Sequence, residues 1–325
     1  MTEITPFSII VPVYNGAETL EALLTILTAQ DYPPEKYEII VVNDGSTDNS
    51  AEIAQNYPVN LIDLKPNQGR VVARNTGAKA AQYERLVFND VRVTPNKNLL
   101  RTLNERNYQP LIPNIEDYDG SRWGFARFFY LLLCKLYYPY YPLSQAEPEF
   151  FITPDNFDEM PKGTGLFCCD KQLWLACQPS ATNKMVSDDT KILRQIVEHA
   201  HILRTLSVAA TYKQRTEFGP VMAHTLQRGP LFGDYYLRPG GYHFKLYLII
   251  WLGIVLFMIG LFIWPIIVLL FMITIGVTGL FVIALYLSQS WLDIVVVFLY
   301  FPFIIVAFGF GILKWQIAEL TKGKV

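Results

Sequence analysis

Short runs of β-branched residues alternate with helical patterns over residues 7–88 of the chain. The strand-like runs are residues 7–13, 37–42, 59–64 and 85–88. The helical pattern between the first two runs consists of Leu20, Leu23, Leu24 and Leu27. Residues 70–81 indicate another helix before the last run. Strands and helices that alternate through short connectors predict a parallel sheet covered by helices on both faces.

The pattern is less regular beyond residue 95. Residues 125–141 are aromatic and apolar and carry two charges, those of Arg127 and Lys135. The many Tyr and Phe residues favour an amphipathic helix at a membrane interface over a helix in a protein core. Residues 165–169 indicate a further strand, and residues 184–199 indicate a helix.

The C-terminal part of the chain is almost entirely apolar. Residues 246–313 contain one charged side chain, that of Asp293. A single helix over residues 246–287 would be roughly 60 Å long, about twice the thickness of a hydrocarbon core, so the chain must turn back within it. Pro265 provides one break, because proline cannot continue the helical hydrogen bonds, and residues 288–293 provide a second. Apolar segments that follow one another without polar faces predict insertion into a membrane.

Length and charge disagree on how often the chain crosses this membrane. Residues 246–264, 266–287 and 294–313 are each about long enough to span, which gives three crossings. The positive-inside rule favours an even number, because basic residues flank the apolar segments on both sides. These residues are Arg228, Arg238 and Lys245 before the segments, and Lys314, Lys322 and Lys324 after them. We expect three crossings; in the alternative, residues 246–264 lie along the interface or re-enter.

These patterns predict a chain of four parts. Residues 1–230 form a cytosolic α/β domain with an interface segment at about residues 122–143. Residues 231–245 are a juxtamembrane linker, residues 246–316 hold three transmembrane helices, and residues 317–325 are a short tail. The first residues lack the charged and apolar regions of a signal peptide, so the domain is expected to stay in the cytosol. We expect an integral protein of the plasma or inner membrane.

Composition narrows the classes of partner. The chain has 325 residues, of which 51% are hydrophobic and 17% are charged, and its net charge is −2. This charge gives no support for a nucleic-acid partner. The cysteines, which are Cys134, Cys168, Cys169 and Cys177, show neither a zinc-ligand spacing nor a Cys-x-x-Cys pair. We expect them to be small buried thiols.

Three acidic positions are candidates for chemistry. Asp44 and Asp90 each follow a predicted strand, and Asp188 and Asp189 open a predicted helix. Ligands of parallel sheets bind beyond the carboxyl ends of the strands, where the first two acids are expected. Taken alone, two of these positions have ordinary explanations. Asp44-Gly45 is a common turn, and an acidic pair such as Asp188-Asp189 is a common helix N-cap.

Three motifs change that interpretation. Ile9–Asn15 reads IIVPVYN, Ile39–Asp48 reads IIVVNDGSTD, and Asn67–Gly77 reads NQGRVVARNTG. In this order and spacing they resemble the family 2 glycosyltransferases, and the resemblance covers roughly residues 6–230. It implies an α/β GT-A nucleotide-diphospho-sugar transferase fold, with a mostly parallel sheet and flanking helices. The first motif lacks the Gly-x-Gly-x-x-Gly pattern of a Rossmann dehydrogenase.

The resemblance also implies a donor site. The donor is expected to be a nucleotide-diphosphate sugar, with Pro12, Tyr14 and Asp44 lining its base and ribose. Arg74 would support the donor from the neighbouring helix. Gln227-Arg228-Gly229 resembles the family's basic motif near the membrane, so Arg228 is expected to clamp the diphosphate through a bidentate contact. Contact of Arg228 with lipid headgroups is the alternative.

The family's Asp-x-Asp motif is altered in this chain. Phe88-Asn89-Asp90 stands in its place, so that Asp90 matches the metal-binding acid and Phe88 replaces the first acid. The resemblance implies Mg²⁺ or Mn²⁺ as a cofactor, and such hard cations prefer carboxylate and phosphate oxygens. Asp90 is the expected ligand, and Asn89 is expected to supply a neutral oxygen.

A general base is expected further along the chain. Gly163–Phe167 resembles the family's acceptor-side strand, and Ser187–Thr190 resembles its acidic pair. By this match Asp189 is the base and Asp188 its neighbour, although the order could be reversed. Two adjacent carboxylates repel each other, which is expected to raise the pKa of one of them towards a value useful for proton abstraction.

We therefore expect a membrane-anchored enzyme that moves a single sugar from a nucleotide-diphosphate sugar to a lipid, lipid-linked or saccharide acceptor at the cytosolic membrane face. Membrane lipids are expected partners. A polysaccharide-chain synthase is one alternative. A non-catalytic membrane scaffold that kept the fold is the other, and its support is the altered motif at Phe88-Asn89.

Overall fold

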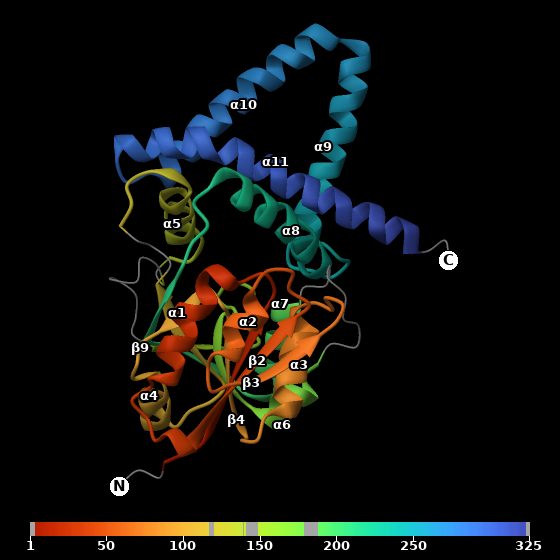
Figure 1. The fold of residues 1–325 in the computed structure, drawn as a ribbon. Coiled ribbons are helices and arrows are strands. Elements are labelled where there is room, and N and C mark those ends of the chain that lie inside the picture. Colours follow the sequence, from red (N-terminus) through yellow and green to blue (C-terminus); the bar gives the residue numbers. More distant parts are fainter. Residues whose placement is uncertain (1–3, 117–119, 139, 141–148, 179–187, 323–325) are drawn as a thin grey trace. The chain divides into compact units, whose positions relative to one another are not determined.

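The computed structural model describes residues 4–116, 120–138, 140, 149–178 and 188–322. Contacts divide the chain into two compact units. The first unit comprises Met1–Asp117 and Pro139–Gln214, and the second comprises Tyr118–Tyr138 and Arg215–Val325. Figure 1 shows the elements of both units along the chain.

The first unit begins with a four-stranded parallel sheet in the order β3-β2-β1-β4. Its strands are β1 (Phe7–Val13), β2 (Tyr37–Asp44), β3 (Asn60–Leu64) and β4 (Arg85–Asn89). The intervening helices are α1 (Ala17–Thr28), η1 (Pro34–Lys36), α2 (Ser50–Gln55) and α3 (Arg70–Ala80). These elements confirm the parallel sheet and the helices predicted from the hydrophobic pattern.

The sheet continues beyond β4 with mixed strand directions. β8 (Leu166–Asp170) pairs antiparallel to β4, and β6 (Leu111–Glu116) and β9 (Ile202–Tyr212) pair parallel to each other. β5 (Val93–Pro95) and β7 (Glu149–Ile152) both pair antiparallel to β9. The remaining helices of the unit are α4 (Leu99–Arg106), α6 (Lys171–Ala176) and α7 (Asp188–His199). The sheet is therefore parallel in its first half and mixed in its second half.

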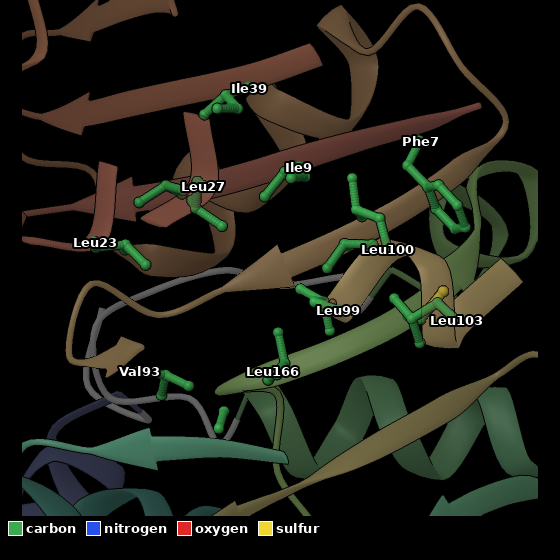
Figure 2. Close-up of a cluster of buried hydrophobic side chains, with 14 of the residues drawn as sticks. Phe7, Ile9, Leu23, Leu27, Ile39, Val93, Leu99, Leu100, Leu103 and Leu166 are labelled. Atoms are coloured by element: carbon green, nitrogen blue, oxygen red, sulfur yellow. The ribbon is translucent and has the colours of Figure 1, made fainter. Parts of the chain in front are cut away.

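A hydrophobic core holds α1 and α4 against one face of this sheet (Figure 2). The labelled side chains are Phe7, Ile9, Leu23, Leu27, Ile39, Val93, Leu99, Leu100, Leu103 and Leu166. The leucines of α1 are fully buried, as their helical spacing predicted. Burying one such side chain stabilises a fold by about 1.5–3 kcal/mol, so this cluster fixes the strand ends that carry the site.

The cysteines behave as the sequence predicted. Cys134, Cys168, Cys169 and Cys177 are all buried and free. Burial raises the pKa of the Cys168 thiol to about 12, so this thiol is neutral at physiological pH. The role of small buried thiols is confirmed.

The second unit contains five helices among the described residues. They are α5 (Gly124–Leu136), α8 (Phe218–Tyr236), α9 (Phe244–Ile263), α10 (Pro265–Leu287) and α11 (Trp291–Lys322). Pro265 is the first residue of α10, which confirms the predicted break at this position. α9, α10 and α11 are long and apolar enough to cross a membrane, which indicates membrane anchoring.

Candidate active site

The four parallel strands bring their carboxyl ends to one edge of the sheet. Val13 of β1 lies opposite Asn43 of β2, so the loops after these strands start side by side. β8 runs against β4, with Leu166 opposite Asn89, and this pairing brings the residues before β8 to the same edge. The backbone N–H of Asp90 donates to the Gly165 carbonyl at 2.7 Å. Among the predicted acids, Asp44, Asp90 and Asp189 have described side chains, and the elements that carry them meet at this edge.

Asp44 links the motif at Ile39–Asp48 to the motif at Asn67–Gly77 through hydrogen bonds. Its side chain is 3% exposed, and its two oxygens accept the backbone N–H groups of Gln68 at 2.7 Å and Gly69 at 2.8 Å. The Asn67 side chain donates to the Asp44 carbonyl at 3.0 Å. Gly45 has φ +71°, and a Cβ there would lie 2.7 Å from the Asn67 backbone N, so only glycine fits this turn. Asp44 therefore fixes the loop that opens α3.

Pro12 and Tyr14 lie at the end of β1. Pro12 is half-buried, and the Tyr14 side chain is 53% exposed. Between them and the loop after β2, the Asn15 side-chain oxygen accepts the Thr47 backbone N–H at 2.8 Å. Asp48 accepts the Ala17 backbone N–H at 3.1 Å, so the two loops are joined at two points. An exposed aromatic ring on a fixed loop is suited to stacking against a planar base, and this role for Tyr14 remains a prediction.

Arg74 and Asp189 form an ion pair from two distant parts of the chain. Arg74 lies on α3 and is 3% exposed, and its guanidinium donates to Asp189 Oδ1 near the start of α7. The Asp189 side chain keeps 28% exposure, so one side of the carboxylate remains open to solvent. The pair joins the predicted donor-supporting residue to the predicted base.

The electrostatics of Asp189 bear on the pKa rise expected for one acid of the pair. Partial burial acts to raise the pKa of Asp189, but the Arg74 guanidinium beside it, with Arg70 and the Thr164 hydroxyl, holds this pKa well below its ordinary value. Asp189 is therefore not the acid of the pair whose pKa is raised. The side chain of Asp188 lies outside the described residues, so its predicted role is untested.

Phe88 stands at the aligned position of the motif's first acid. Its side chain is fully buried, and its ring centroid lies 4.0 Å from that of Trp174. Because Phe88 is a core residue, it does not reach the sheet edge. Asn89 is the last residue of β4, and Asp90, which is partly exposed, follows it.

The chemistry of Asn89 and Asp90 fits a hard cation in part. Asp90 Oδ1 accepts the Arg92 backbone N–H at 2.9 Å. Asn89 donates to the Asp90 and Val93 carbonyls at 2.9 and 2.8 Å, and within the described chain its buried Oδ1 accepts no hydrogen bond. No group of three or more His, Cys, Asp or Glu side chains that could hold a metal occurs among the described residues. A cation here would need oxygens from a bound ligand to complete its coordination.

Arg228 belongs to the second unit. It lies on α8, and its side chain is exposed. At 100° per residue, Arg228 is about 200° around the helix from Leu226, so it is on nearly the opposite side. The predicted clamp on a diphosphate remains a prediction.

Sequence reasoning missed two residues near Asp189. Thr164, in the segment before β8, and Arg70, at the start of α3, both lower the pKa of Asp189. Arg70 precedes Arg74 by four residues, which places both on one helix face, and this spacing was a usable signal. Thr164 gave no such signal, because its proximity to Asp189 depends on the pairing of β8 with β4.

Asp44 allows a prediction about nucleotide binding. Asp44→Asn replaces one acceptor oxygen by an NH₂ group that would face a backbone N–H of the α3 loop, so one buried hydrogen bond is lost. We expect the loss to destabilise the loop by about 1–3 kcal/mol and to weaken nucleotide binding while the domain stays folded. Isothermal titration calorimetry with nucleoside diphosphates measures this, and unchanged affinity would rule out Asp44 as a donor-site residue.

The fold and this edge define a class. A mixed sheet whose parallel half presents acids at its carboxyl ends is found in GT-A nucleotide-diphospho-sugar transferases. The structure of Staphylococcus aureus TarS has the same fold, with a TM-score of 0.51, 19% identity, and coverage of 71% of this chain and 44% of that chain. TarS residues 1–349 in complex with UDP-GlcNAc give a TM-score of 0.50 and 18% identity, with 69% and 66% covered.

Sequence comparisons make the assignment more specific. Residues 8–157 match the model of glycosyl transferase family 2. Glycosyltransferase AglE of Haloferax volcanii is 39% identical over 106 residues, which cover 31% of this chain and 35% of AglE. Poly-β-1,6-N-acetyl-D-glucosamine synthase of Staphylococcus epidermidis is 37% identical over 86 residues, which cover 25% of this chain and 20% of the synthase.

Residues 8–157 of the chain therefore carry a glycosyl transferase family 2 domain. The matched stretches span about a third and a fifth of the two relatives' own lengths. The similarity to these relatives therefore lies in the N-terminal domain.

Proposed function

We propose that this protein transfers a single sugar from a nucleotide-diphosphate sugar to a lipid, lipid-linked or saccharide acceptor at the cytosolic face of a membrane. The observation that carries the proposal is the joining of Arg74 to Asp189 at the same sheet edge as Asp44 and Asp90. Transfer requires a donor pocket, charge neutralisation for the departing diphosphate, and a base for the acceptor hydroxyl. This edge offers a candidate for each.

The donor would lie across the ends of β1 and β2. Tyr14 and Pro12 would contact the base, and Asp44 would accept a hydrogen bond from it while holding the loop at Gln68. A carboxylate offers about four lone-pair positions, so the two backbone N–H groups that Asp44 accepts leave room for a further donor. TarS, which shares the fold, binds UDP-GlcNAc. The base and sugar that this chain prefers are to be found by assay.

Asp189 would act as the general base. Because the Arg74 guanidinium keeps its pKa low, Asp189 is ionised at neutral pH, which a carboxylate must be to accept a proton, and it is a weaker base than an unpaired Asp. The acceptor hydroxyl would give its proton to this carboxylate while its oxygen bonds to the anomeric carbon of the sugar. The bond from that carbon to the diphosphate breaks, and the nucleoside diphosphate leaves. Asp188 is the alternative base.

A divalent cation, Mg²⁺ or Mn²⁺, would neutralise charge on the departing diphosphate. Asp90 and Asn89 are the residues that would hold it, with donor phosphates completing its coordination. Arg74 and Arg228 are the basic groups proposed to share this task. Within the described residues, the buried Nε of Arg74 donates to no partner, so it retains donor capacity.

Asp90 provides the test of the cation. Asp90→Asn removes the one anionic ligand of this proposed site, so turnover that depends on added Mg²⁺ or Mn²⁺ should be lost. Rates of wild type and variant are compared after treatment with EDTA and after restoring each metal. Full activity of the wild type in excess EDTA would contradict a metal requirement and would assign the charge to the arginines.

A lipid-bearing acceptor is favoured by the second unit. A groove of about 900 Å³ between α8 and α11 is lined by apolar side chains only. They are Met222, Ala223, Leu226, Pro302, Phe303, Val306, Ala307 and Phe310. Such a surface suits a hydrocarbon chain, and the long apolar helices of the same unit would keep the enzyme beside its acceptor.

A polysaccharide-chain synthase is the second candidate, because the relative from Staphylococcus epidermidis is named as one. Product length separates the two. Membranes are given donor with a labelled sugar, and the products are extracted with organic solvent and sized. A labelled lipid that carries one added sugar supports the proposal, whereas a ladder or a high-mass polymer supports the synthase. Absence of any labelled product with every donor would favour the scaffold.

A further inference from the structure

The three apolar helices of the second unit form a closed triangle. The start of α9 meets the end of α11, where the Gln316 side chain donates to the Tyr247 hydroxyl and the Tyr247 and Trp315 ring centroids are 6.4 Å apart. The end of α9 is joined to the start of α10 at Trp264-Pro265. Figure 1 shows α9 and α10 meeting at one corner and α11 closing the opposite side.

The third corner joins α10 to α11. Three residues, Ser288 to Ser290, separate the two helices, and Ala284 and Leu287 of α10 pack in one buried cluster with Val296 and Val297 of α11. The segment of α11 between its two corners therefore connects the end of α10 to the start of α9.

This geometry excludes three parallel crossings. If α9 and α10 both cross the bilayer, the chain returns to the side from which it left. The start of α9 and the end of α10 then lie on one side, and so do the two ends of the α11 segment that joins them. At most two sides of a closed triangle can run across a slab, and the third lies along one of its faces.

The contacts of α11 identify it as the third side. α5 packs beside its first part: Arg127 donates to both oxygens of Asp293 at 2.6 and 2.8 Å, and the Phe125 and Tyr300 ring centroids are 4.5 Å apart. Asp293 is 1% exposed, so this pair is enclosed by protein.

α8 packs beside the rest of α11 and runs in the same direction. The rings of Phe218 and Phe303 are 5.3 Å apart near the start of α8. Where α8 and α11 pack most closely, a Cβ on Gly229 would lie 2.6 Å from the Gly311 backbone, so the two backbones approach as closely as glycine allows. Near the end, Arg238 donates to Glu319 at 3.0 Å.

The companions of α11 carry groups that do not suit hydrocarbon. Gln227 and Arg228 on α8 and Lys135 on α5 are exposed. If α11 crossed the bilayer, its companions would be drawn into the hydrocarbon with it, where an exposed charge is strongly unfavourable. α10 meets Lys135 at its last turn, where the ammonium lies 4.8 Å from the Tyr286 ring centroid. The most apolar 18-residue windows of α9 and α10 are 0% buried among the described residues.

The free face of α11 is a continuous apolar stripe. Leu299, Val306, Leu313 and Leu320 are spaced seven residues apart and are 46%, 55%, 42% and 76% exposed. A helix with one apolar face and one face covered by charge-bearing protein is suited to lie in the interface plane of a membrane.

We infer that α11 lies along the membrane interface with α5 and α8, and that α9 and α10 form the membrane-inserted hairpin. The C-terminus is then on the same side as the start of α9, and the number of crossings is even. This replaces the predicted third crossing. It also satisfies the positive-inside rule, because Lys314, Lys322 and Lys324 fall on the side of Arg238.

Cysteine labelling tests on which side of the membrane each probed position of the helix triangle lies. Tyr242→Cys, Gln289→Cys and Lys324→Cys are made singly in the full chain and probed with an impermeant maleimide on intact cells and after lysis. The wild type is the blank, because its cysteines are buried. We expect all three positions to be protected until lysis. Labelling of Lys324→Cys on intact cells, with the other two protected, would overturn the inference and establish three crossings.

Depth along α11 provides an independent measurement. Spin labels at Leu299, Val306, Leu313 and Leu320 cover 21 residues, or about 31 Å of helix. Collision with oxygen and with a polar nickel complex in lipid vesicles reports the depth of each label. An interfacial α11 gives four similar depths, whereas a crossing helix gives a maximum in the middle and shallow values at both ends, which would overturn the inference.

Discussion

Replacing Asp189 by asparagine is expected to lower sugar transfer by about 10²–10⁴-fold, because a general base contributes a factor of this size. Nucleotide binding should be retained, since Asp44 and Tyr14 are unchanged. The variant should also be less stable by about 1–3 kcal/mol, because the buried Arg74 guanidinium loses its charged partner. Initial rates and nucleotide affinity are measured on the same membrane preparation.

Asp31→Asn is the matched control for this variant. Asp31 pairs with Arg101 on the surface, with side chains 59% and 52% exposed, and such pairs contribute about 0–1 kcal/mol. It should leave both rate and stability unchanged. An Asp189→Asn enzyme with wild-type rate would refute the assignment, and loss of rate in Asp188→Asn alone would assign the base to Asp188.

Replacing Arg74 by methionine is expected to lower the rate by about 10–100-fold at neutral pH. Hydrogen bonds to charged groups are worth about 1.5–3 kcal/mol, and each 1.36 kcal/mol changes a rate tenfold. Methionine keeps much of the apolar stem of Arg74 but cannot orient the Asp189 carboxylate. Arg70→Met is the matched control, and its effect should be smaller because Arg70 is exposed.

Arg74→Met should also change the pH dependence. In the wild type the pKa of Asp189 is depressed, so the group stays ionised across pH 5–9 and adds no acid limb to the rate profile. Its contribution to stability is present above the unfolded pKa and is lost only as the pH falls through the folded one. Without Arg74, burial is less opposed and this pKa rises, so the variant's rate should fall as the pH is lowered. If the rates of the wild type and of Arg74→Met depend on pH in the same way, the proposed effect of Arg74 on Asp189 is contradicted.

The first half of the fold was predictable from the sequence, because buried parallel strands are continuous β-branched runs. Residues 7–13 and 37–42 show this pattern directly, and β1 and β2 confirm it. The second half was not predictable in this way. β9 pairs with three other strands, and its register with β6 shifts after Pro113, so its sequence lacks a simple alternation.

The candidate site shows the same division. Asp44 and Asp90 were placed correctly at strand ends because local sequence determines where a strand stops. The pairing of Arg74 with Asp189 spans 115 positions in the chain, and local patterns do not encode such a contact. For this reason the lowered pKa of Asp189 could not be predicted from the acidic pair alone. The ungapped motif match showed that Phe88 replaces an acid, but not that its side chain lies in the core.

The orientation of the membrane part depends on contacts that composition does not show. Residues 294–313 are as apolar as a spanning helix, but their neighbours Arg127, Gly229 and Arg238 lie far away in the sequence. Only the packed helices reveal that one side of α11 is already occupied. Length and hydropathy identify apolar helices, and contacts are needed to orient them.

The most direct test of the proposed activity is donor turnover over a panel of nucleotide-diphosphate sugars. Membranes containing the wild-type chain, Asp44→Asn or Asp189→Asn are given each donor with Mg²⁺ or Mn²⁺, and released nucleoside diphosphate is measured against time. We predict release from at least one donor by the wild type, a reduced rate at limiting donor for Asp44→Asn, and near-complete loss for Asp189→Asn. Equal release by all three proteins, or no binding and no release with any donor, would contradict the proposal that this sheet edge transfers a sugar.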